Sequence, residues 1–327
     1  MSEKIIVTGA AGFIGFSLCR ELLKKKVDIL AVDNFNEYYS LELKESRYNL
    51  LMHESKECDN FFSFKRLDLT DKNALEKVMV DFKPSIVCHL AAQAGVRYSL
   101  ENPQTYVDNN INATLNLLEI SRKIGVKDIV FSSTSSVYGL SDNVPFSEGT
   151  KLDSPISPYS STKLACEALC HTYHYLYGIR FRILRFFTVY GPWGRPDMAL
   201  FIFTKSIIEN KPIKVFNSGD MKRDFTYIDD IIAGFLLAID KSYDFEIFNL
   251  GFGKTVKLEN FIDILERNLG KKAIKKYFPL QPGDVPATWS DISKAREMLG
   301  YNPKVDVSLG ISNFVNWYNQ YNDSKNP

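Results

Sequence analysis

Gly9-Ala10-Ala11-Gly12-Phe13-Ile14-Gly15 directly follows the apolar stretch Lys4–Thr8 and leads into a predicted helix that reaches about Lys25. Since Lys4–Thr8 is predicted to be a strand, the three glycines stand between a strand and a helix. Glycines at this spacing let backbone N–H groups approach a pyrophosphate, and the helix N-terminus adds positive charge. A glycine-rich turn alone is weak evidence, but the strand before it and the helix after it are the context that the motif requires. The stretch therefore predicts a dinucleotide-binding βαβ unit.

A second strand, predicted at Val27–Val32, ends at Asp33. An acid roughly 20 residues after such a glycine turn accepts hydrogen bonds from the adenosine ribose. No arginine or lysine follows before Lys44, so a 2′-phosphate would meet the carboxylate without a cation nearby. This favours NAD over NADP; the alternative is that Asp33 only caps the end of the strand.

Predicted strands and helices continue to alternate as far as residue 190. Strands are predicted at 61–67, 84–90, 128–133 and 180–186, and helices at 41–52, 103–124 and 157–177. This order is typical of an α/β fold of the Rossmann type, a doubly wound parallel sheet with helices on both faces. The strands end in Asp68, in Ala91 and Ala92, and in Ser132–Ser136. Ligands bind at this edge of open α/β sheets.

The pattern changes at the loop Gly191–Asp197, which is rich in glycine and proline. Beyond it, helices are predicted at 198–209, 227–240, 257–269, 291–299 and 306–320, and short strands at 213–216, 245–249 and 274–278. No second glycine turn occurs there. We therefore expect a NAD-binding Rossmann domain at 1–190, which carries Tyr159 and Lys163, and a smaller C-terminal α/β substrate-binding lobe at 191–327. The two can interleave.

The totals are those of an ordinary globular chain of 327 residues, with 45% hydrophobic and 24% charged residues. A net charge of +1 gives no basic footprint for a nucleic acid. No apolar run approaches the ~20 residues that span a bilayer. A strand from Lys4 leaves no room for a signal peptide, so we expect a cytoplasmic protein without a membrane partner. Five cysteines without a C-x-x-C pair argue against a disulfide framework or a zinc ribbon.

Cys166, Cys170 and His174 fall at positions i, i+4 and i+8 of one predicted helix, with His171 beside them. One helix can offer two metal ligands at i and i+4, but a third ligand a turn further on lies too far along the axis. We therefore expect these side chains to pack a helix interface, and we predict no metal ion.

Ser157-Pro158-Tyr159-Ser160-Ser161-Thr162-Lys163 also points to chemistry. Ser157 can cap the free N–H groups of a helix, and proline is tolerated in its first turn. Tyr159 and Lys163 are four residues apart and share a helix face. A tyrosine with its usual pKa of about 10 is a poor base at neutral pH, but a neighbouring ammonium can lower that pKa by roughly 1 to 3 units. The pair predicts a proton-transfer device that needs an oxidised nicotinamide; the alternative is an exposed tyrosine and lysine on an ordinary helix.

The glycine turn, Asp33, the strand end at Thr134 and the Tyr159/Lys163 pair occur in an order that resembles the extended short-chain dehydrogenases/reductases. From Ile5 to about Trp317 the chain is similar to the nucleotide-sugar 4-epimerase branch of that family. Three long strings resemble UDP-glucuronate 4-epimerases: HLAAQAGVRY at 89–98, GPWGRPDM at 191–198 and RDFTYIDD at 223–230.

The resemblance implies roles for the matching residues. Tyr159 is expected to be the catalytic base and acid, Lys163 to hold the cofactor ribose and tune Tyr159, and Thr134 to hydrogen-bond the sugar 4-hydroxyl. Asn109 is expected to brace the active-site backbone and Arg223 to grip the UDP phosphates. The cofactor contacts expected in full are Gly9, Gly12, Phe13, Ile14, Gly15, Asp33, Asn34, Asp68, Leu69, Leu90, Ala91, Ala92, Asn109, Ser132, Tyr159, Lys163 and Phe186. The substrate contacts expected are Arg97, Thr134, Ser135, Ser136, Thr188, Arg195, Met198, Val215, Phe216, Arg223, Gln281 and Asp284.

Two of these substrate residues keep alternatives. Galactose-type epimerases usually carry arginine where Gln281 stands, and Arg97 can reach a phosphate or only a neighbouring carbonyl.

The implied reaction passes through a transient 4-keto sugar, with hydride returned to the opposite face. A 4-keto uronic acid can lose carbon dioxide, so the enzyme must hold the carboxylate. Arg195 could grip it bidentately, or be a surface loop arginine.

The residues after Thr134 discriminate between reaction types. Related 4,6-dehydratases carry Asp-Glu there and related UDP-glucuronate decarboxylases carry a glutamate, whereas this chain has Ser135-Ser136. The resemblance therefore implies an isomerase that epimerises UDP-glucuronate to UDP-galacturonate. The alternatives are a UDP-glucose or UDP-N-acetylglucosamine 4-epimerase, then a UDP-glucuronate decarboxylase or a non-catalytic NAD-binding protein. The family commonly forms homodimers through helices near 103–124 and 157–177, and capsule or lipopolysaccharide sugar supply would fit a bacterial source.

Overall fold

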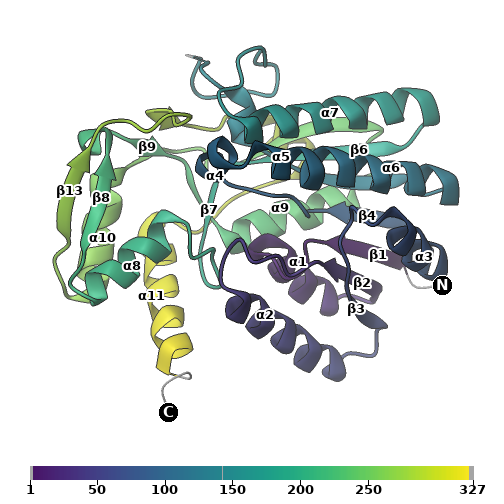
Figure 1. The fold of residues 1–327 in the computed structure, drawn as a ribbon, viewed down its shortest axis with the longest axis horizontal. Coiled ribbons are helices and arrows are strands. Elements are labelled where there is room, and N and C mark those ends of the chain that lie inside the picture. The colour runs from purple at the N-terminus through teal and green to yellow at the C-terminus, as the bar shows by residue number, and fades with distance from the viewer. Residues whose placement is uncertain (1–2, 142, 324–327) are drawn as a thin grey trace.

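The computed structural model describes residues 3–141 and 143–323. A parallel sheet of seven strands forms its centre, in the order β11-β6-β5-β4-β1-β2-β3 (Figure 1). These strands are β1 (Glu3–Thr8), β2 (Val27–Asp33), β3 (Phe62–Arg66), β4 (Ile86–His89), β5 (Asp128–Thr134), β6 (Arg180–Phe186) and β11 (Phe245–Leu250). The doubly wound parallel sheet predicted from the alternation of strands and helices is confirmed.

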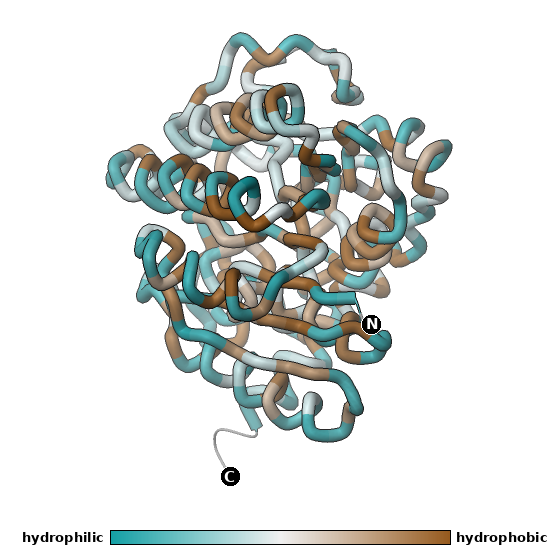
Figure 2. The backbone as a smooth tube through the Cα atoms, turned by 90° about the vertical axis from the view of Figure 1, so that its right-hand side faces the viewer, coloured by the Kyte–Doolittle hydropathy of each residue, from teal (hydrophilic) through white to brown (hydrophobic). Residues whose placement is uncertain are grey.

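Helices cover both faces of the sheet, because successive residues of a strand point to opposite faces. Ile5 and Val7 of β1 belong to one apolar core, and Ile6 belongs to another. The first core lies against α1 (Phe13–Leu23), α2 (Leu41–Glu54) and α9 (Ile228–Asp240). The second lies against α3 (Lys72–Phe82), α6 (Ala113–Ile124) and α7 (Pro158–Tyr177). In Figure 2 the apolar segments run mostly through the interior and the hydrophilic ones mostly outside.

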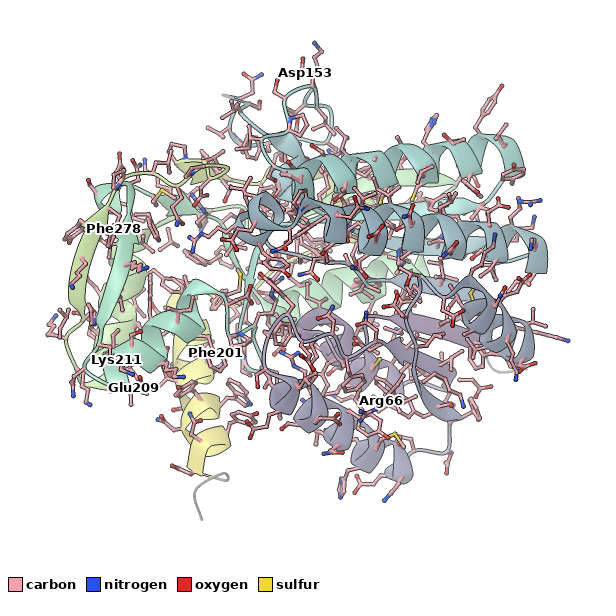
Figure 3. The ribbon with its side chains drawn as sticks, viewed as in Figure 1. Arg66, Asp153, Phe201, Glu209, Lys211 and Phe278 are labelled. Carbon is pink, nitrogen blue, oxygen red and sulfur yellow. The ribbon has the colours of Figure 1, made fainter. Side chains whose placement is uncertain are left out.

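The smaller lobe lies at the left of Figure 1. Its helices are α8 (Ala199–Ile208), α10 (Leu258–Leu269) and α11 (Val307–Asp323). Its strands are β8 (Pro212–Phe216), paired with β13 (Ile274–Phe278), and β9 (Lys222–Arg223), between β12 (Val256–Lys257) and β14 (Ala287–Thr288). Phe201 of α8 packs its ring edge-on against those of Phe314 and Trp317 of α11 (Figure 3).

A short parallel pair, β7 (Thr188–Tyr190) with β10 (Phe225–Tyr227), leads from the sheet to this lobe. The sequence placed strand 245–249 in the smaller lobe, which is wrong: β11 pairs in parallel with β6 along the edge of the central sheet. Since α9 also packs against α1, residues 228–250 return the chain to the larger part. A short apolar strand does not reveal from its sequence which sheet edge it joins.

Most predicted elements lie within three residues of the observed ones, but the helix expected at 103–124 is divided. It consists of α5 (Pro103–Tyr106), a wide turn at Val107–Asn112 with π-type hydrogen bonding, and α6. The segment expected at 291–299 forms the same kind of turn at Ala295–Leu299. Helices α3 (Lys72–Phe82) and α4 (Val96–Glu101) were not foreseen. Single 3₁₀ turns occur at Ser55–Glu57, Ser135–Tyr138 and Asn217–Gly219. Within the described ranges, every helix is too short or too polar to cross a membrane.

Candidate active site

A cleft of about 1120 Å³ runs along the carboxyl ends of the central strands and into the smaller lobe. Every residue expected to contact NAD lines it, from Gly9 to Phe186. So does every residue expected to contact the substrate except Val215. Along β8 alternate side chains face opposite sides, so Phe216 reaches the cleft while Val215 is fully buried in the core. The cleft thus brings together residues from both parts of the chain.

The glycine turn approaches the neighbouring backbone too closely for a side chain. A Cβ added to Gly9 would lie 2.8 Å from the Ala91 nitrogen, and one added to Gly15 would lie 2.1 Å from the Gly9 oxygen. Gly9 also has a φ of +72°, which favours glycine. The turn therefore brings the start of α1 close to the cleft, and a helix N-terminus in this position is the arrangement that binds a phosphate.

Asp33 is held at the end of β2 by the backbone N–H groups of Ala11 and Phe35, at 2.9 and 2.8 Å. Burial raises the pKa of Asp33, while those hydrogen bonds and the charge on Lys44 lower it. The expectation that no cation stands near Asp33 is corrected here, because α2 brings Lys44 into the cleft wall. The Lys44 ammonium is hydrogen-bonded to the backbone and side-chain oxygens of Asn36, at 2.5 and 2.8 Å. Burial lowers the pKa of Lys44 to about 8.

Four buried polar atoms of the cleft residues lack a hydrogen-bond partner within the described chain. They are the Nε2 of Gln93, the Oγ of Ser132, the Oε1 of Gln281 and the Oγ1 of Thr288. Buried polar groups are nearly always paired, so these atoms indicate positions that a ligand or water completes. Ser132 stands in the part of the cleft expected to hold NAD, and Gln281 in the part expected to hold the nucleotide of the substrate. Thr288 was missed because a threonine on a two-residue strand has no recognisable pattern.

Tyr159 and Lys163 are presented by the first turns of α7, as predicted. Ser157 and Ser160 form a reciprocal cap, in which each side chain accepts a hydrogen bond from the other residue's backbone N–H at 3.1 Å. Burial raises the pKa of Tyr159, while a hydrogen bond with Thr134 and the charge on Arg195 lower it. This brings the three expected catalytic residues to one place.

Lys163 differs from its expected electrostatic role. Its side chain is buried, its ammonium lies 4.3 Å from the centre of the Phe131 ring, and burial lowers its pKa. Among the described residues, the groups that lower the pKa of Tyr159 are Thr134 and Arg195 rather than Lys163. The tuning of Tyr159 by Lys163 therefore receives no support from this arrangement of side chains.

The residue that braces the cleft backbone is Asn110, one position after the residue expected from the sequence. Its side chain accepts a hydrogen bond from the Gln93 N–H at 2.8 Å and donates to the Gln93 carbonyl at 3.1 Å. It also donates to the Thr162 hydroxyl at 3.0 Å. Asn109 lines the cleft and donates to the Thr105 carbonyl of its own helix. The wide turn at Val107–Asn112 decides which asparagine faces inward, and such turns are frequent at functional sites.

Thr134 ends β5 and begins the single turn Ser135–Tyr138. Its hydroxyl accepts a hydrogen bond from the Ser136 N–H and donates to the Ser136 hydroxyl, both at 3.2 Å. Together with Ser135 and Thr188, these residues line the cleft with hydroxyl groups beside Tyr159. Hydroxyls can both donate and accept, so this wall suits a substrate that carries both hydroxyl and carboxylate groups.

Arg195 is already paired. Its Nε and Nη2 donate to the two carboxylate oxygens of Asp197, at 2.9 and 2.5 Å, and Tyr38 donates to the same carboxylate at 3.1 Å. The side chain of Arg195 is one-fifth exposed. The reading as a surface loop arginine is wrong, since Arg195 lines the cleft, but its fork is bound to Asp197 rather than free.

The far end of the cleft carries two arginines. Arg223 pairs with Asp284 at 2.6 Å, and Arg97 lies 5.0 Å from the centre of the Phe216 ring. Burial lowers the pKa of Arg223, and the nearby charge on Arg97 acts in the same direction. Two like charges held close together indicate a site for an anion, such as a diphosphate.

Comparison with known proteins bears on this arrangement. The profile of the NAD dependent epimerase/dehydratase family matches residues 5–251. The chain belongs to this family. It is 48% identical to the UDP-glucuronate 4-epimerase of Thermodesulfobacterium geofontis, over 95% of both chains. The resemblance to nucleotide-sugar epimerases expected from the sequence is confirmed.

Solved structures of nucleotide-sugar epimerases have the same fold as this chain. The UDP-glucuronic acid 4-epimerase of Bacillus cereus, in complex with UDP-glucuronic acid and NAD, is 40% identical with a TM-score of 0.90, over 97% of this chain and 99% of that one. The UDP-glucose 4-epimerase of Thermotoga maritima, with UDP-glucose, is 31% identical with a TM-score of 0.88, over the same shares. The extended short-chain dehydrogenase/reductase fold is therefore confirmed.

A fully buried arginine, Arg47, was not predicted from the sequence. The Nη1 of Arg47 donates to the Ala11 carbonyl of the glycine turn at 2.8 Å, and its Nη2 donates to the Trp193 carbonyl at 2.6 Å. Arg47 thus joins the turn that faces the cofactor to the loop that carries Arg195. Its position in a polar helix looks like a surface site, so no sequence signal marked it.

The Cys166, Cys170 and His174 group packs the interior, as expected. Both thiols are buried, and the Cys166 thiol donates to the Asn110 carbonyl at 3.3 Å. The His174 ring contacts the Ile179 carbonyl at 2.9 Å and packs against Phe245. These contacts join α7 to its neighbours.

Proposed function

We propose that the chain is a NAD-dependent UDP-glucuronate 4-epimerase, which converts UDP-glucuronate into UDP-galacturonate. The observation that carries the proposal is the hydroxyl-rich turn Thr134–Ser136 beside Tyr159, without an acidic residue. Relatives with that activity in their names, at 48% and 40% identity over nearly the whole chain, support it.

The cofactor part of the cleft fits NAD. The glycine turn keeps the start of α1 close to the cleft, where it would meet a pyrophosphate, and Asp33 would accept hydrogen bonds from ribose hydroxyls. The unpaired Ser132 hydroxyl marks a contact that the chain leaves open. Lys163 is placed to hold the second ribose. When bound, NAD would supply the hydride chemistry at carbon 4 of the sugar.

Tyr159 moves the proton. Its phenolate accepts the proton of the 4-hydroxyl as the ketone forms and returns it after the sugar has turned over. Burial raises the pKa of Tyr159, so the phenolate needs stabilisation from Thr134 and Arg195. Such general acid–base catalysis is typically worth about 10²- to 10⁴-fold in rate.

The uronate carboxylate needs a fixed position, because the 4-keto acid can decarboxylate when the bond to its carboxylate aligns with the carbonyl π system. The hydroxyls of Ser135, Ser136 and Thr188, with Thr134, surround the position expected for that group. At the opposite end of the cleft, Arg97 and Arg223 would bind the diphosphate. Phe216, Gln281 and Thr288, which line the same end, would contact the rest of the nucleotide.

One observation favours a second candidate, a 4-epimerase of a neutral UDP-sugar. The fork of Arg195 is bound to Asp197, so no free bidentate cation waits for a uronate carboxylate. The UDP-glucose relative from Thermotoga maritima, at 31% identity, is compatible with this candidate.

A decarboxylase fits less well, because serines replace the acid in the Thr134–Ser136 turn. The Ser136→Glu variant is accordingly expected to release more carbon dioxide, and unchanged release would contradict this reading of the turn.

We also propose the remaining organisation. Residues 1–190 form the NAD-binding domain and 191–327 mainly the lobe for the nucleotide sugar, with 228–250 returning to the first. A homodimer through α6 and α7 is supported by their exposed Leu115, Tyr175 and Leu176. A cytoplasmic location is supported by five free thiols, which suit a reducing compartment. The product would supply an acidic sugar for polysaccharide biosynthesis.

The decisive experiment incubates the purified protein with UDP-glucuronate, without added cofactor, and follows the anomeric proton signals by NMR. Formation of UDP-galacturonate without UDP-pentose is expected, since NAD is regenerated in each cycle and remains bound. UDP-pentose would favour the decarboxylase. Turnover of only UDP-glucose or UDP-N-acetylglucosamine would favour the second candidate. The Tyr159→Phe variant serves as the inactive control.

A further inference from the structure

A buried ion pair lies behind the strand end that carries Thr134. Arg185 on β6 donates from Nε and Nη2 to the two carboxylate oxygens of Glu167 on α7, at 3.1 and 2.6 Å. The two side chains are only 2% and 6% exposed. Removing charges from water is unfavourable unless they are paired and hydrogen-bonded, so the surroundings of this pair must satisfy it closely.

The same ion pair holds both ends of the hydroxyl-rich turn. Before the turn, the Ser133 hydroxyl donates to the Glu167 carboxylate at 2.5 Å. After it, the Tyr138 hydroxyl accepts a hydrogen bond from Arg185 Nη1 at 3.1 Å. Thr134, Ser135 and Ser136 lie between these two anchors and line the cleft. We call Ser133, Tyr138, Glu167 and Arg185 the clamp.

Tyr138 is fixed from a second direction. Its hydroxyl donates to the Asn249 side chain on β11 at 2.6 Å, and its ring stacks on Phe146 with centroids 4.7 Å apart and planes at 16°. Asn249 in turn donates to the Phe146 carbonyl at 2.8 Å. Phe146 belongs to the loop that rises at the top of the molecule, where Asp153 is labelled (Figure 3). The end of the turn is therefore held by hydrogen bonds and by aromatic packing.

Side chains must do this work because the sheet ends just before the turn. In the pairing of β5 with β6, Thr134 opposite Phe186 is the last position. Beyond it, few backbone hydrogen bonds support the turn, such as that of the Gly139 N–H to the Ser136 carbonyl at 3.2 Å. Sheet hydrogen bonds therefore fix the backbone of Ser133 and Thr134, and Ser136 is tied to the Thr134 hydroxyl. The far end of the turn depends on what holds Tyr138.

Stability alone explains the clamp poorly. A buried ion pair is often no more stabilising than apolar side chains of the same volume, so its presence is weak evidence for a stabilising role. A network in which every member is paired does, however, restrict its surroundings to one arrangement. The arrangement restricted here is that of the hydroxyls that face the reacting sugar.

We propose that the clamp positions the Ser135–Ser136 hydroxyls and thereby decides whether the 4-keto uronate is epimerised or decarboxylated. This inference rests on the proposed function and deepens it. In decarboxylation, the bond between carbon 5 and the carboxylate carbon breaks as carbon dioxide leaves. Its electron pair passes to the ketone as an enolate, and carbon 5 then takes up a proton. The clamp holds the carboxylate away from the alignment that this bond cleavage needs. Tyr138, Glu167 and Arg185 are positioning residues, since none of them lines the cleft.

Two variants test the clamp while keeping the ion pair. Tyr138→Phe retains the stacked ring and removes the hydroxyl at one anchor, and Ser133→Ala removes the hydroxyl at the other. Tyr301→Phe is the matched control, because Tyr301 is equally buried and its hydroxyl donates to a single carbonyl, that of Gly251, at 3.0 Å. Variants of Glu167 or Arg185 are avoided, since an unpaired buried charge would disturb folding itself.

The first measurement is amide hydrogen exchange of the peptide 134–139 in the protein without sugar nucleotide. Tyr138→Phe is expected to accelerate exchange at Ser136 and Gly139 on the order of tenfold, with little change elsewhere, since local opening reports how firmly the segment is held. Tyr301→Phe should leave this peptide unchanged. Exchange equal to that of the unmodified protein would overturn the clamp, whatever the enzyme does to sugars.

The second measurement is the product ratio with UDP-glucuronate, read by NMR as UDP-galacturonate against UDP-pentose and its 4-keto form. Because a misplacement of about 1 Å can cost about 10²-fold in rate, we expect kcat for epimerisation to fall roughly tenfold in Tyr138→Phe. The decarboxylated share should rise, and KM should change little, because the nucleotide is held elsewhere. Ser133→Ala should act in the same direction. In the double variant the loss of kcat should be smaller than the product of the two single losses, because both changes act on one network.

The outcomes separate the two proposals. Faster exchange with an unchanged product ratio would overturn the control of product choice and leave only a structural role. A protein that turns over neutral UDP-sugars alone would refute the proposed function and, with it, this control. Its exchange data would still decide whether the clamp holds the turn.

Discussion

Replacing His89 by glutamine should remove a defined part of the acid sensitivity of the fold. His89 ends β4 and lies fully enclosed between two threonines, with Nδ1 2.8 Å from the Thr8 hydroxyl and Nε2 3.0 Å from the Thr114 hydroxyl. The Thr8 oxygen already accepts the N–H groups of Leu90 and Ala91, both at 3.1 Å. Its own hydrogen therefore goes to Nδ1, which leaves the proton of neutral His89 on Nε2.

This arrangement opposes protonation of His89, and burial lowers its pKa to about 3, with the charge on Lys163 acting in the same direction. In the unfolded chain a histidine has a pKa of about 6.5. Between these values the unfolded state binds the extra proton, so stability falls as the pH falls below 6.5. At pH 5.0, about 1.5 units below that value, the loss amounts to about 2 kcal/mol, at 1.36 kcal/mol per unit.

Urea unfolding at pH 7.5 and pH 5.0 measures this loss. His89→Gln should be less stable than the unmodified protein at pH 7.5, but it should lose about 2 kcal/mol less on acidification. His53→Gln, at an exposed histidine, is the control and should keep the full loss. An equal loss in His89→Gln and the unmodified protein would refute the reasoning, because His89 would then titrate alike in both states.

Three further predictions concern the cleft. Gly15→Ala would place a Cβ 2.1 Å from the Gly9 oxygen, so it should cost about 1–3 kcal/mol of stability in urea unfolding and weaken the binding of NAD. Asn110→Ala leaves the Gln93 N–H and carbonyl unpaired and should lower the free energy of unfolding by about 1–3 kcal/mol, whereas Asn109→Ala should change it by no more than about 0.5 kcal/mol; equal effects would contradict the assignment. Arg195→Met should lower kcat/KM for UDP-glucuronate by about tenfold more than kcat/KM for any neutral UDP-sugar accepted, since a hydrogen bond to a charged group is worth about 1.5–3 kcal/mol. An equal loss for both sugars would assign Arg195 to Asp197 alone.

Much of the fold could be predicted because its signals are local. The glycine turn, the strand after it and Asp33 lie within one βαβ unit, so their spacing alone determines how they meet. The start of α7 is similar: its serine cap and proline fix where the helix begins, and hence which face carries Tyr159 and Lys163. Such features can be predicted from the sequence because the residues that determine them are close together in the chain.

The errors concern features that distant contacts decide. Strand β11 reads as a short apolar strand in any sheet, and only pairing with β6 places it. The residue predicted to brace the cleft backbone was Asn109, and the structure gives this role to its neighbour Asn110. The wide turn in this helix determines which of the two side chains faces the cleft backbone. Lys44 was judged too far along the chain to matter, yet α2 returns it to the neighbourhood of Asp33.

Arg195 shows how such contacts change chemistry as well as position. Of its five N–H groups, one on Nε and one on Nη2 are bound to Asp197, and the other on Nη2 lies 3.5 Å from the Ala94 carbonyl. Only Nη1 makes no hydrogen bond to the described residues. While Asp197 stays paired, Arg195 can therefore donate to a further carboxylate end-on, from Nη1, and not from Nε and Nη2 together. An end-on contact leaves the carboxylate free to rotate about its bond to the ring. The restraint on that rotation must then come from the hydroxyls of the Thr134–Ser136 turn, which makes the support of that turn part of the chemistry.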